Sequence, residues 1–248
     1  PCHRRYPIPV AYSEASRLFA GRASLDRDDN LRDYKAGWPF APDQIDAADP
    51  QAGARWAWNF EKRYRGAGPR GRFRISQLPN RAGGVLRYEG RFFVVQTAGR
   101  TDLAASDYRT PDAKDMLWAA GGEFTAPFSA RELAWRQFRG ANSQQRWEEP
   151  DDVFVYVPSM RKMRRSATPW IDGAFVPAFG AAGESAGGGL PLGNSGGINP
   201  TAGLSIAASE DARVGLTGLF LRPNAWVWRL IGEQAVIAPL NGRESGYP

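Results

Sequence analysis

Histidine, cysteine and methionine are scarce in this sequence, whose 248 residues include one His, one Cys and three Met. A zinc site built from His and Cys needs more ligands than Cys2 and His3 can supply. A single cysteine also excludes an intrachain disulfide, which is typical of the cytosol and equally of the Gram-negative periplasm. Cys2 could pair with another chain, carry a lipid, or be an incidental thiol.

Long apolar runs are missing as well. No stretch of about 18 apolar residues occurs, so the sequence predicts no membrane-spanning helix, and no signal peptide is recognisable. What is present is a 42% apolar fraction with nine Trp, which is enough for a substantial core. The net charge is +6, and a basic chain suits nucleic acid, anionic lipid headgroups or neither.

The most informative stretch is 151–169. Large apolar residues alternate at period two over 153–157, which predicts a strand with apolar groups on both faces. A Pro-Ser break at 158–159 then leads into a return strand that carries four basic residues: Arg161, Lys162, Arg164 and Arg165. Alternation would divide these charges between two faces, so a phosphate-binding surface and a cationic edge that blocks strand pairing are both open interpretations.

Two helices are predicted, over 13–25 and from Asp49-Pro50 to Gly66. The second has one stripe of large apolar residues at four-residue spacing, which we expect to be its buried face: Trp56, Phe60 and Tyr64. Trp58 falls off this stripe, so a strand through this region stays open.

The rest of the chain has the pattern of short strands. A hairpin is predicted over 85–96 with its turn at Glu89-Gly90, and a half-buried strand over 130–138. After a Gly-rich loop at 180–203, three more strands are predicted: 214–221, 225–231 and 233–239. About eight strands, mostly antiparallel, without alternating helices predict a β-rich α+β fold. We expect one domain over 1–248, with an N-terminal arm at 1–12.

No convincing catalytic constellation is found. The segment 193–197, Gly-Asn-Ser-Gly-Gly, matches a serine-nucleophile motif, but His3 is remote in sequence and no strand-to-helix turn surrounds Ser195. The acidic run 148–152 could hold a metal or act as an acid/base pair, although it is more often a solvated turn, and it could pair with the basic return strand. We therefore expect a binding protein without a cofactor rather than an enzyme.

Four motifs in order along the chain carry a resemblance to a known family. They are Tyr-Lys-Ala-Gly-Trp-Pro-Phe at 34–40, Trp-Asn with Arg-Tyr-Arg-Gly at 58–66, Val-Tyr-Val-Pro-Ser-Met-Arg-Lys-Met-Arg-Arg at 155–165, and Trp-Arg-Leu-Ile-Gly with Ala-Pro-Leu-Asn at 228–241. Together they resemble the domain-of-unknown-function family 1329, which is similar to the periplasmic lipoprotein carrier LolA and its outer-membrane receptor LolB. The tract 180–203 is longer than the family pattern, and family members continue past the last motif with further strands.

The resemblance implies a strongly curved antiparallel sheet, a half-barrel wrapped around a few helices and possibly incomplete at its C-terminus, with an apolar cavity for acyl chains. It implies an exported protein of the periplasm or outer-membrane periphery of a Gram-negative bacterium, without catalytic residues. We therefore expect a non-catalytic carrier-like protein that binds lipid or lipoprotein acyl chains. The basic residues of the return strand would contact headgroups or a partner. The expected cavity-lining residues are Trp56, Phe60, Trp135, Val155, Val157, Trp226 and Trp228.

Two other functions stay open. An incomplete sheet, a Pro-rich arm and Gly-rich loops suit a structural or assembly subunit of an envelope or membrane-associated complex, with a membrane transporter or other subunits as partners. Nucleic-acid binding is the weaker alternative, because the chain has no recognisable nucleic-acid motif. The expected partners are thus lipids and proteins, and no nucleic acid.

Overall fold

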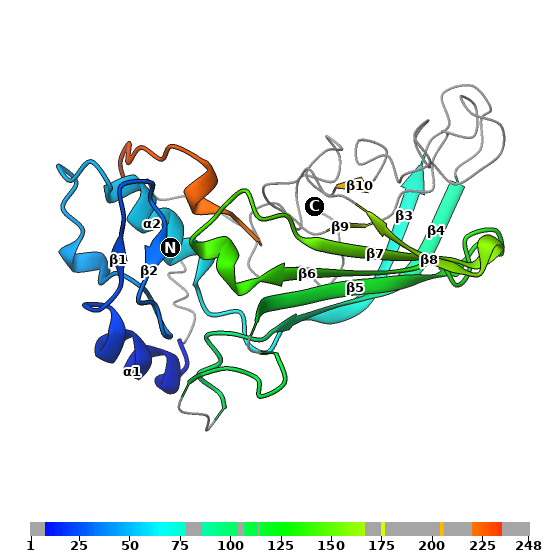
Figure 1. The fold of residues 1–248 in the computed structure, drawn as a ribbon, viewed down its shortest axis with the longest axis horizontal. Helices are drawn as coiled ribbons and strands as arrows, with labels where there is room; N and C mark the ends of the chain where they lie inside the picture. The colour runs from blue at the N-terminus through cyan, green and yellow to red at the C-terminus, as the bar shows by residue number, and fades with distance from the viewer. Residues whose placement is uncertain are drawn as a thin grey trace, which may run out of the picture.

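The computed structural model describes residues 8–77, 86–103, 107–113, 115–166, 175–176, 204–205 and 220–234. Its centre is a six-stranded antiparallel sheet, and both described helices lie at one end of it (Figure 1). Strand order in the sheet follows chain order, so each strand pairs with the next as in a meander. The strands are β3 (Arg70–Gln77), β4 (Leu86–Gln96), β5 (Met116–Ala126), β6 (Ala134–Gly140), β7 (Asp152–Val157) and β8 (Lys162–Ser166). The β-rich α+β class is confirmed.

The N-terminal region supplies the helices α1 (Val10–Phe19) and α2 (Ala52–Glu61), so both predicted helices exist with shifted ends. The remaining elements are short: β1 (Ser24–Leu25), β2 (Leu31–Arg32), η1 (Pro42–Gln44), η2 (Ala141–Gln144), η3 (Pro158–Met160), β9 (Phe175–Val176), β10 (Leu204–Ser205) and η6 (Pro223–Ala225). β1 pairs with β2, and β9 pairs with β10.

The predicted buried stripe of α2 is wrong. Trp56, Phe60 and Tyr64 are 39%, 46% and 44% exposed, whereas Trp58 is 2% exposed. Trp58 packs with Leu31 and Phe40, and its Nε1 donates to the backbone oxygen of Asp29 at 2.8 Å. Contacts with the β1–β2 region therefore select the face of α2 that is buried, and the spacing of large residues does not.

The hairpin predicted over 85–96 is also wrong, because this segment is the single strand β4. Gly90 lies inside that strand, where a Cβ atom would come within 2.3 Å of the Phe73 ring on β3. The pairing with β5 shifts register between Glu89 and Gly90. Glycine here marks a bulge and a close approach of a ring, not a turn.

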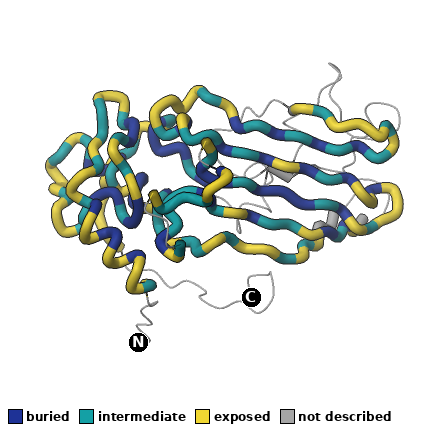
Figure 2. Tube along the Cα trace, turned by 60° about the horizontal axis from the view of Figure 1, so that its bottom comes forward, coloured by how far each residue is buried: buried dark blue, intermediate teal, exposed yellow. Residues whose placement is uncertain are grey.

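The hairpin predicted over 151–169 is confirmed by β7, η3 and β8 over its described part. Arg161 closes the turn in the left-handed region, with a φ of 49°. The alternation along β7 is visible in its burial, since Val153, Val155 and Val157 are buried at 1% exposure or less. Figure 2 shows similar alternation of buried and less buried residues along neighbouring strands.

The core lies against one face of the sheet. Trp135 and Phe124 pack with the three β7 valines, and the rings of Phe73 and Tyr88 join them at edge-to-face angles. Gly122 makes room for this packing, because a Cβ atom there would lie 2.5 Å from the Trp135 ring. The described sheet is open and not strongly curled (Figure 1).

The strand predicted over 225–231 is absent. Residues 223–225 form η6, and 226–234 have no strand pairing. The prediction failed because this segment packs along α2 and not in a sheet: a Cβ atom on Gly53 would lie 2.5 Å from the Trp228 carbonyl oxygen. Most of the strands predicted over 214–221 and 233–239, the loop 180–203 with Ser195, and residues Cys2 and His3 lie outside the described residues.

Candidate functional site

One face of the sheet, opposite the core, carries a row of alternating cations and rings. Residues paired across antiparallel strands share a face, and the register places Arg70, Phe93, Gly121, Arg136, Phe154 and Arg165 in one row from β3 to β8. The Arg136 guanidinium carbon lies 4.9 Å from the Phe93 ring centre. A Cβ atom on Gly121 would come within 2.9 Å of Arg136 Cδ, so glycine leaves the space that the arginine crosses.

Adjacent rows on this face keep an excess of positive charge. Exposed arginines stand at 70, 72, 74, 87, 91, 136 and 165, against the three acids Glu89, Glu123 and Asp152, so seven charges face three and the excess is +4. The acids form ion pairs, with Arg91 to Glu123 at 2.6 Å and Arg74 to Glu89 at 3.0 Å. We call this surface the arginine face.

Two turns lie at the end of the sheet away from the helices (Figure 1), and large apolar side chains at this end are exposed. Phe128 in the β5–β6 turn is 91% exposed, and Met163 at the start of β8 is 66% exposed. The basic residues Arg131 and Arg161 belong to the same two turns, Lys162 is the first residue of β8, and all three are exposed, as is the acid Glu132 beside Arg131. Because β6 pairs with β7, the two turns lie at the same end. We call the two apolar and three basic residues the distal tip.

The four basic residues of the return strand separate, as alternation predicts. Arg161 is in the turn. Lys162 and Arg164 pair with β7 valines on the core side of the sheet. Arg165 lies opposite Phe154 on the arginine face and forms an ion pair with Asp152.

The seven residues expected to line an acyl cavity occupy two different environments. Trp135, Val155 and Val157 are at most 2% exposed within the packed core. The other four lie on α2 and the segment beside it: Trp56, Phe60, Trp226 and Trp228. Trp226 is 49% exposed, and Trp228 Nε1 donates to the Pro223 oxygen at 2.8 Å. Neither of the two hollows described below is lined by any of the seven.

The acidic run contains a buried carboxylate. Asp151 is 3% exposed, and its oxygens accept hydrogen bonds from Arg139 Nε at 3.0 Å, Arg222 Nη2 at 2.5 Å and Gln137 Nε2 at 2.7 Å. Burial would raise the pKa of Asp151, but the charges and hydrogen bonds of Arg139, together with Arg222 and Gln137, outweigh burial and hold this pKa below its usual value. A solvated turn is therefore the wrong interpretation for Asp151, whereas Asp152 does pair with the basic return strand.

This buried cluster anchors the segment 220–228 to the sheet. Arg139 Nη1 donates to the backbone oxygens of Phe220 and Leu221 at 2.9 and 3.1 Å. On the helix side, the Leu221 amide donates to Glu61 Oε2 at 2.8 Å. Two buried arginines and one carboxylate thus join a distant part of the chain to β6 and α2, which is a structural role.

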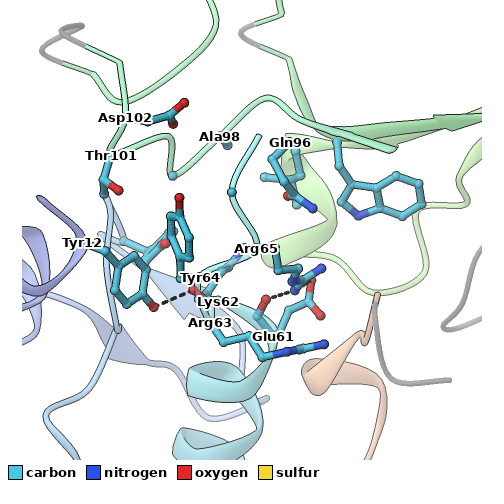
Figure 3. Close-up of a pocket in the computed structure, with 15 residues that line it drawn as sticks. Tyr12, Glu61, Lys62, Arg63, Tyr64, Arg65, Gln96, Ala98, Thr101 and Asp102 are labelled. Atoms are coloured by element: carbon cyan, nitrogen blue, oxygen red, sulfur yellow. Dashed lines mark hydrogen bonds and ion pairs between the residues drawn. The ribbon is translucent and has the colours of Figure 1, made fainter. Parts of the chain in front are cut away.

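A small cavity lies between the C-terminal end of α2 and the adjacent ends of β4 and β5 (Figure 3). Its volume is about 50 Å³. Lys62 Nζ lies 5.1 Å from the Tyr34 ring centre and 5.5 Å from that of Trp58. Burial lowers the pKa of Lys62 to about 7, and the charges of Arg65, Arg139 and Arg109 act in the same direction while Glu61 opposes them.

A larger, open hollow of about 460 Å³ adjoins β5, β6 and β7. Its lining includes three carboxylates, Asp115, Glu149 and Asp152, beside Met116 and Phe138. Carboxylates repel the phosphate groups of lipids, so this hollow is unsuited to anionic headgroups.

Sequence reasoning missed Phe128, Arg136 and Lys62. The row through Arg136 depends on the register of six strands, which a single sequence does not display. Phe128 follows a proline in a turn, and an isolated aromatic residue in such a turn is the only local signal. Lys62 is distinguished by the place of its ammonium group near the ring of Trp58, one helical turn earlier, and the ring of Tyr34 from a distant segment.

Neither a spanning helix nor a metal cluster is found in the described ranges. None of their helices is long and apolar enough to cross a bilayer. The same ranges contain no group of three or more His, Cys, Asp or Glu side chains placed to hold a metal ion.

Comparisons with known proteins give one family. No curated protein and no solved structure matches the chain. The model of a family described as "Protein of unknown function (DUF1329)" matches residues 1–181, which is most of the 248 residues. The chain therefore belongs to the DUF1329 family.

Proposed function

We propose that this protein is a non-catalytic lipid-binding protein of the Gram-negative envelope that docks on anionic lipid surfaces through its distal tip. The observation that carries the proposal is the 91% exposure of Phe128 at the same end of the sheet as exposed Met163, Arg131, Arg161 and Lys162. Protruding apolar side chains flanked by basic residues suit the boundary between headgroups and acyl chains. The periplasmic location rests on the resemblance to the LolA and LolB proteins.

The energetics favour such docking. Burying a Phe or Met side chain contributes about 1.5–3 kcal/mol, and each basic residue near an anionic membrane surface contributes about 1 kcal/mol. The arginine face adds positive charge on the side of the sheet to which Met163 belongs, because Met163 lies in the same row of the sheet as Arg72 and Arg91. The two contributions together suit a reversible attachment.

This mode of binding differs from an acyl chain enclosed in the sheet. Trp135, Val155 and Val157 pack against protein side chains, and the cavity near Lys62, at about 50 Å³, is far below the roughly 300 Å³ at which ligand pockets begin. We therefore propose that lipid contact occurs on the surface, and that its purpose is the transfer of lipid or lipoprotein acyl chains.

Co-sedimentation with vesicles tests the proposal. We expect wild-type protein to pellet with phosphatidylglycerol-containing vesicles and much less with pure phosphatidylcholine vesicles, and salt to weaken the binding. Replacing both Phe128 and Met163 with Ser should remove at least about 3 kcal/mol, which is roughly a hundredfold in partitioning.

The matched control is Leu18→Ser, which changes an exposed leucine, at 62%, on α1. It should leave vesicle binding unchanged. Equal pelleting of the double variant and the wild type would rule out the distal tip as the lipid contact. Tight binding to single-stranded nucleic acid in place of vesicles would assign the arginine face to the nucleic-acid alternative.

A role as an assembly subunit is the second candidate. The observation in its favour is a set of exposed apolar residues around α2 and the segment beside it: Trp56, Phe60, Trp226, Val227 and Ile231. Light scattering after size-exclusion chromatography separates the candidates, since a monomer that binds vesicles supports the first and an obligate assembly the second.

A further inference from the structure

The cavity beside Lys62 contains hydrogen-bond donors that have no acceptor within the described protein. Trp118 lines it and is 1% exposed, and no partner is found for its Nε1. Gln96 lines it as well, and its buried Nε2 also has no partner. Buried donors without acceptors cost about 1–3 kcal/mol each, so two of them at one small cavity point to an acceptor that enters it.

The two carboxylates that line the cavity already accept hydrogen bonds from the protein. Glu61 Oε1 accepts from Arg65 Nη2 at 2.9 Å, and Glu61 Oε2 accepts from the Leu221 amide at 2.8 Å. Both carboxylate oxygens of Asp102 accept from Arg100 at 2.7 Å. The donors of Trp118 and Gln96 therefore face an environment in which the carboxylate oxygens are engaged elsewhere.

Two of the phenol groups at the cavity, those of Tyr12 and Tyr34, donate their hydrogens to backbone oxygens. The Tyr12 hydroxyl donates to the Lys62 backbone oxygen at 2.8 Å, as Figure 3 shows, and the Tyr34 hydroxyl donates to the Gly37 oxygen at 3.1 Å. The hydrogens of these two hydroxyls are thus used within the protein, while the donors of Trp118 and Gln96 have no partner.

The charge at the cavity has the sign that suits an anion. Lys62, Arg63 and Arg65 line it together with Glu61 and Asp102, so three cations face two acids. The groups that act on the Lys62 ammonium from the neighbouring elements are Glu61 and Arg65 near the end of α2, Arg109 before β5, and Arg139 on β6. Because cations predominate among them, burial and repulsion both oppose the charge on Lys62.

We propose that this cavity binds one small oxyanion, such as inorganic phosphate or a short carboxylate, held by Trp118 Nε1, Gln96 Nε2 and Lys62 Nζ. The size fits this class, since about 50 Å³ is three to five times the 10–15 Å³ that one water molecule needs. A bound anion would accept the donors, offset the repulsion on Lys62 and so favour its charged form. The site lies at the other end of the sheet from the distal tip and is independent of lipid binding.

Isothermal titration calorimetry with sodium phosphate, sodium sulfate and sodium acetate, against a chloride background, tests the proposal. We expect saturable one-to-one binding of at least one of the three anions, tighter at pH 6 than at pH 8, because the charged form of Lys62 binds. Lys62→Met should weaken binding at least tenfold, and Trp118→Phe should weaken it by about tenfold, the usual effect of one hydrogen bond to a charged acceptor.

Two exposed residues elsewhere provide matched controls. Lys162→Met and Trp226→Phe, made at exposed positions, should bind as the wild type does. If Trp118→Phe does not fold, Lys62→Met and the pH dependence in the wild type still decide the question. Absence of saturable heat with all three anions at millimolar concentration, or equal binding by Lys62→Met, would show that the cavity holds water only and would overturn the proposal.

Discussion

Replacing Asp151 with Asn should strongly destabilise the fold. Asp151 is the carboxylate between Arg139 and Arg222, which are 2% and 3% exposed. The substitution leaves two buried guanidinium groups without their countercharge. Breaking a buried ion pair from one side typically costs about 3–5 kcal/mol. With a urea m-value of about 3 kcal/mol per molar, the unfolding midpoint should fall by about 1–2 M.

The neighbouring acid supplies the control for this prediction. Asp152 pairs with Arg165, but both side chains are about half exposed or more, at 47% and 69%. Exposed pairs contribute about 0–1 kcal/mol, so Asp152→Asn should shift the urea midpoint by less than about 0.3 M. Arg222→Met should cost less than Asp151→Asn, because it leaves the neutral pair of Arg139 and Asp151.

The pH dependence gives a second readout for the same carboxylate. The folded-state pKa of Asp151 is lowered, so its contribution to stability is present above the unfolded pKa of about 3.9 and is lost as pH falls below it. Stability of the wild type should therefore drop in acid more steeply than that of Asp151→Asn. Equal urea midpoints for the Asp151 and Asp152 variants would refute the view that this buried cluster holds the segment 220–228 to the sheet.

Three further predictions concern α2 and its surroundings. Gly53→Ala should lower the melting temperature, because the new Cβ atom would lie 2.5 Å from the Trp228 oxygen. Alanine in place of glycine usually stabilises a helix by about 1 kcal/mol, so a higher melting temperature would contradict the packing described. Trp58→Ala should cost about 3–5 kcal/mol of unfolding free energy, and Trp56→Ala less than about 1 kcal/mol, both measured by urea unfolding. Burial lowers the folded-state pKa of Lys62 to about 7. Between about pH 7 and 10 the unfolded chain therefore binds one more proton than the folded chain, and the free energy of unfolding should rise with pH. Lys62→Met should remove that rise, and an unchanged slope of unfolding free energy against pH would contradict the prediction.

Local signals in the sequence predicted the elements whose determinants are local. The β7–β8 hairpin follows from period-two valines and a Pro-Ser break. The helix predicted from Asp49-Pro50 exists as α2, although its N-cap is Gln51 and neither Asp49 nor Pro50 has the predicted position in it. The secondary-structure predictions are wrong where contacts with residues distant in the sequence determine the local structure. The prediction of a turn at Gly90 is wrong because the Phe73 ring that lies over this residue belongs to another strand, which the local sequence does not show.

The candidate site was less accessible from the sequence than the fold. Asp151 was grouped with solvated acids, since its partners Arg139 and Arg222 lie 12 and 71 residues away along the chain. The tryptophans at 226 and 228 have strand spacing, but their segment packs on α2. The basic return strand was identified, whereas the protruding Phe128 that gives it an apolar neighbour was not.

The central claim is that the distal tip meets the lipid, and a position-specific fluorescence measurement tests it most directly. Two single-cysteine variants are made in a Cys2→Ser background: Phe128→Cys at the tip and Leu18→Cys on α1. An environment-sensitive fluorophore is attached to the new cysteine of each variant, and phosphatidylglycerol-containing vesicles are added. We predict a blue shift and increased emission for the label at 128 and no change for the label at 18. A shift at 18 without one at 128, or no shift at either position while the protein still pellets with vesicles, would contradict the proposed docking.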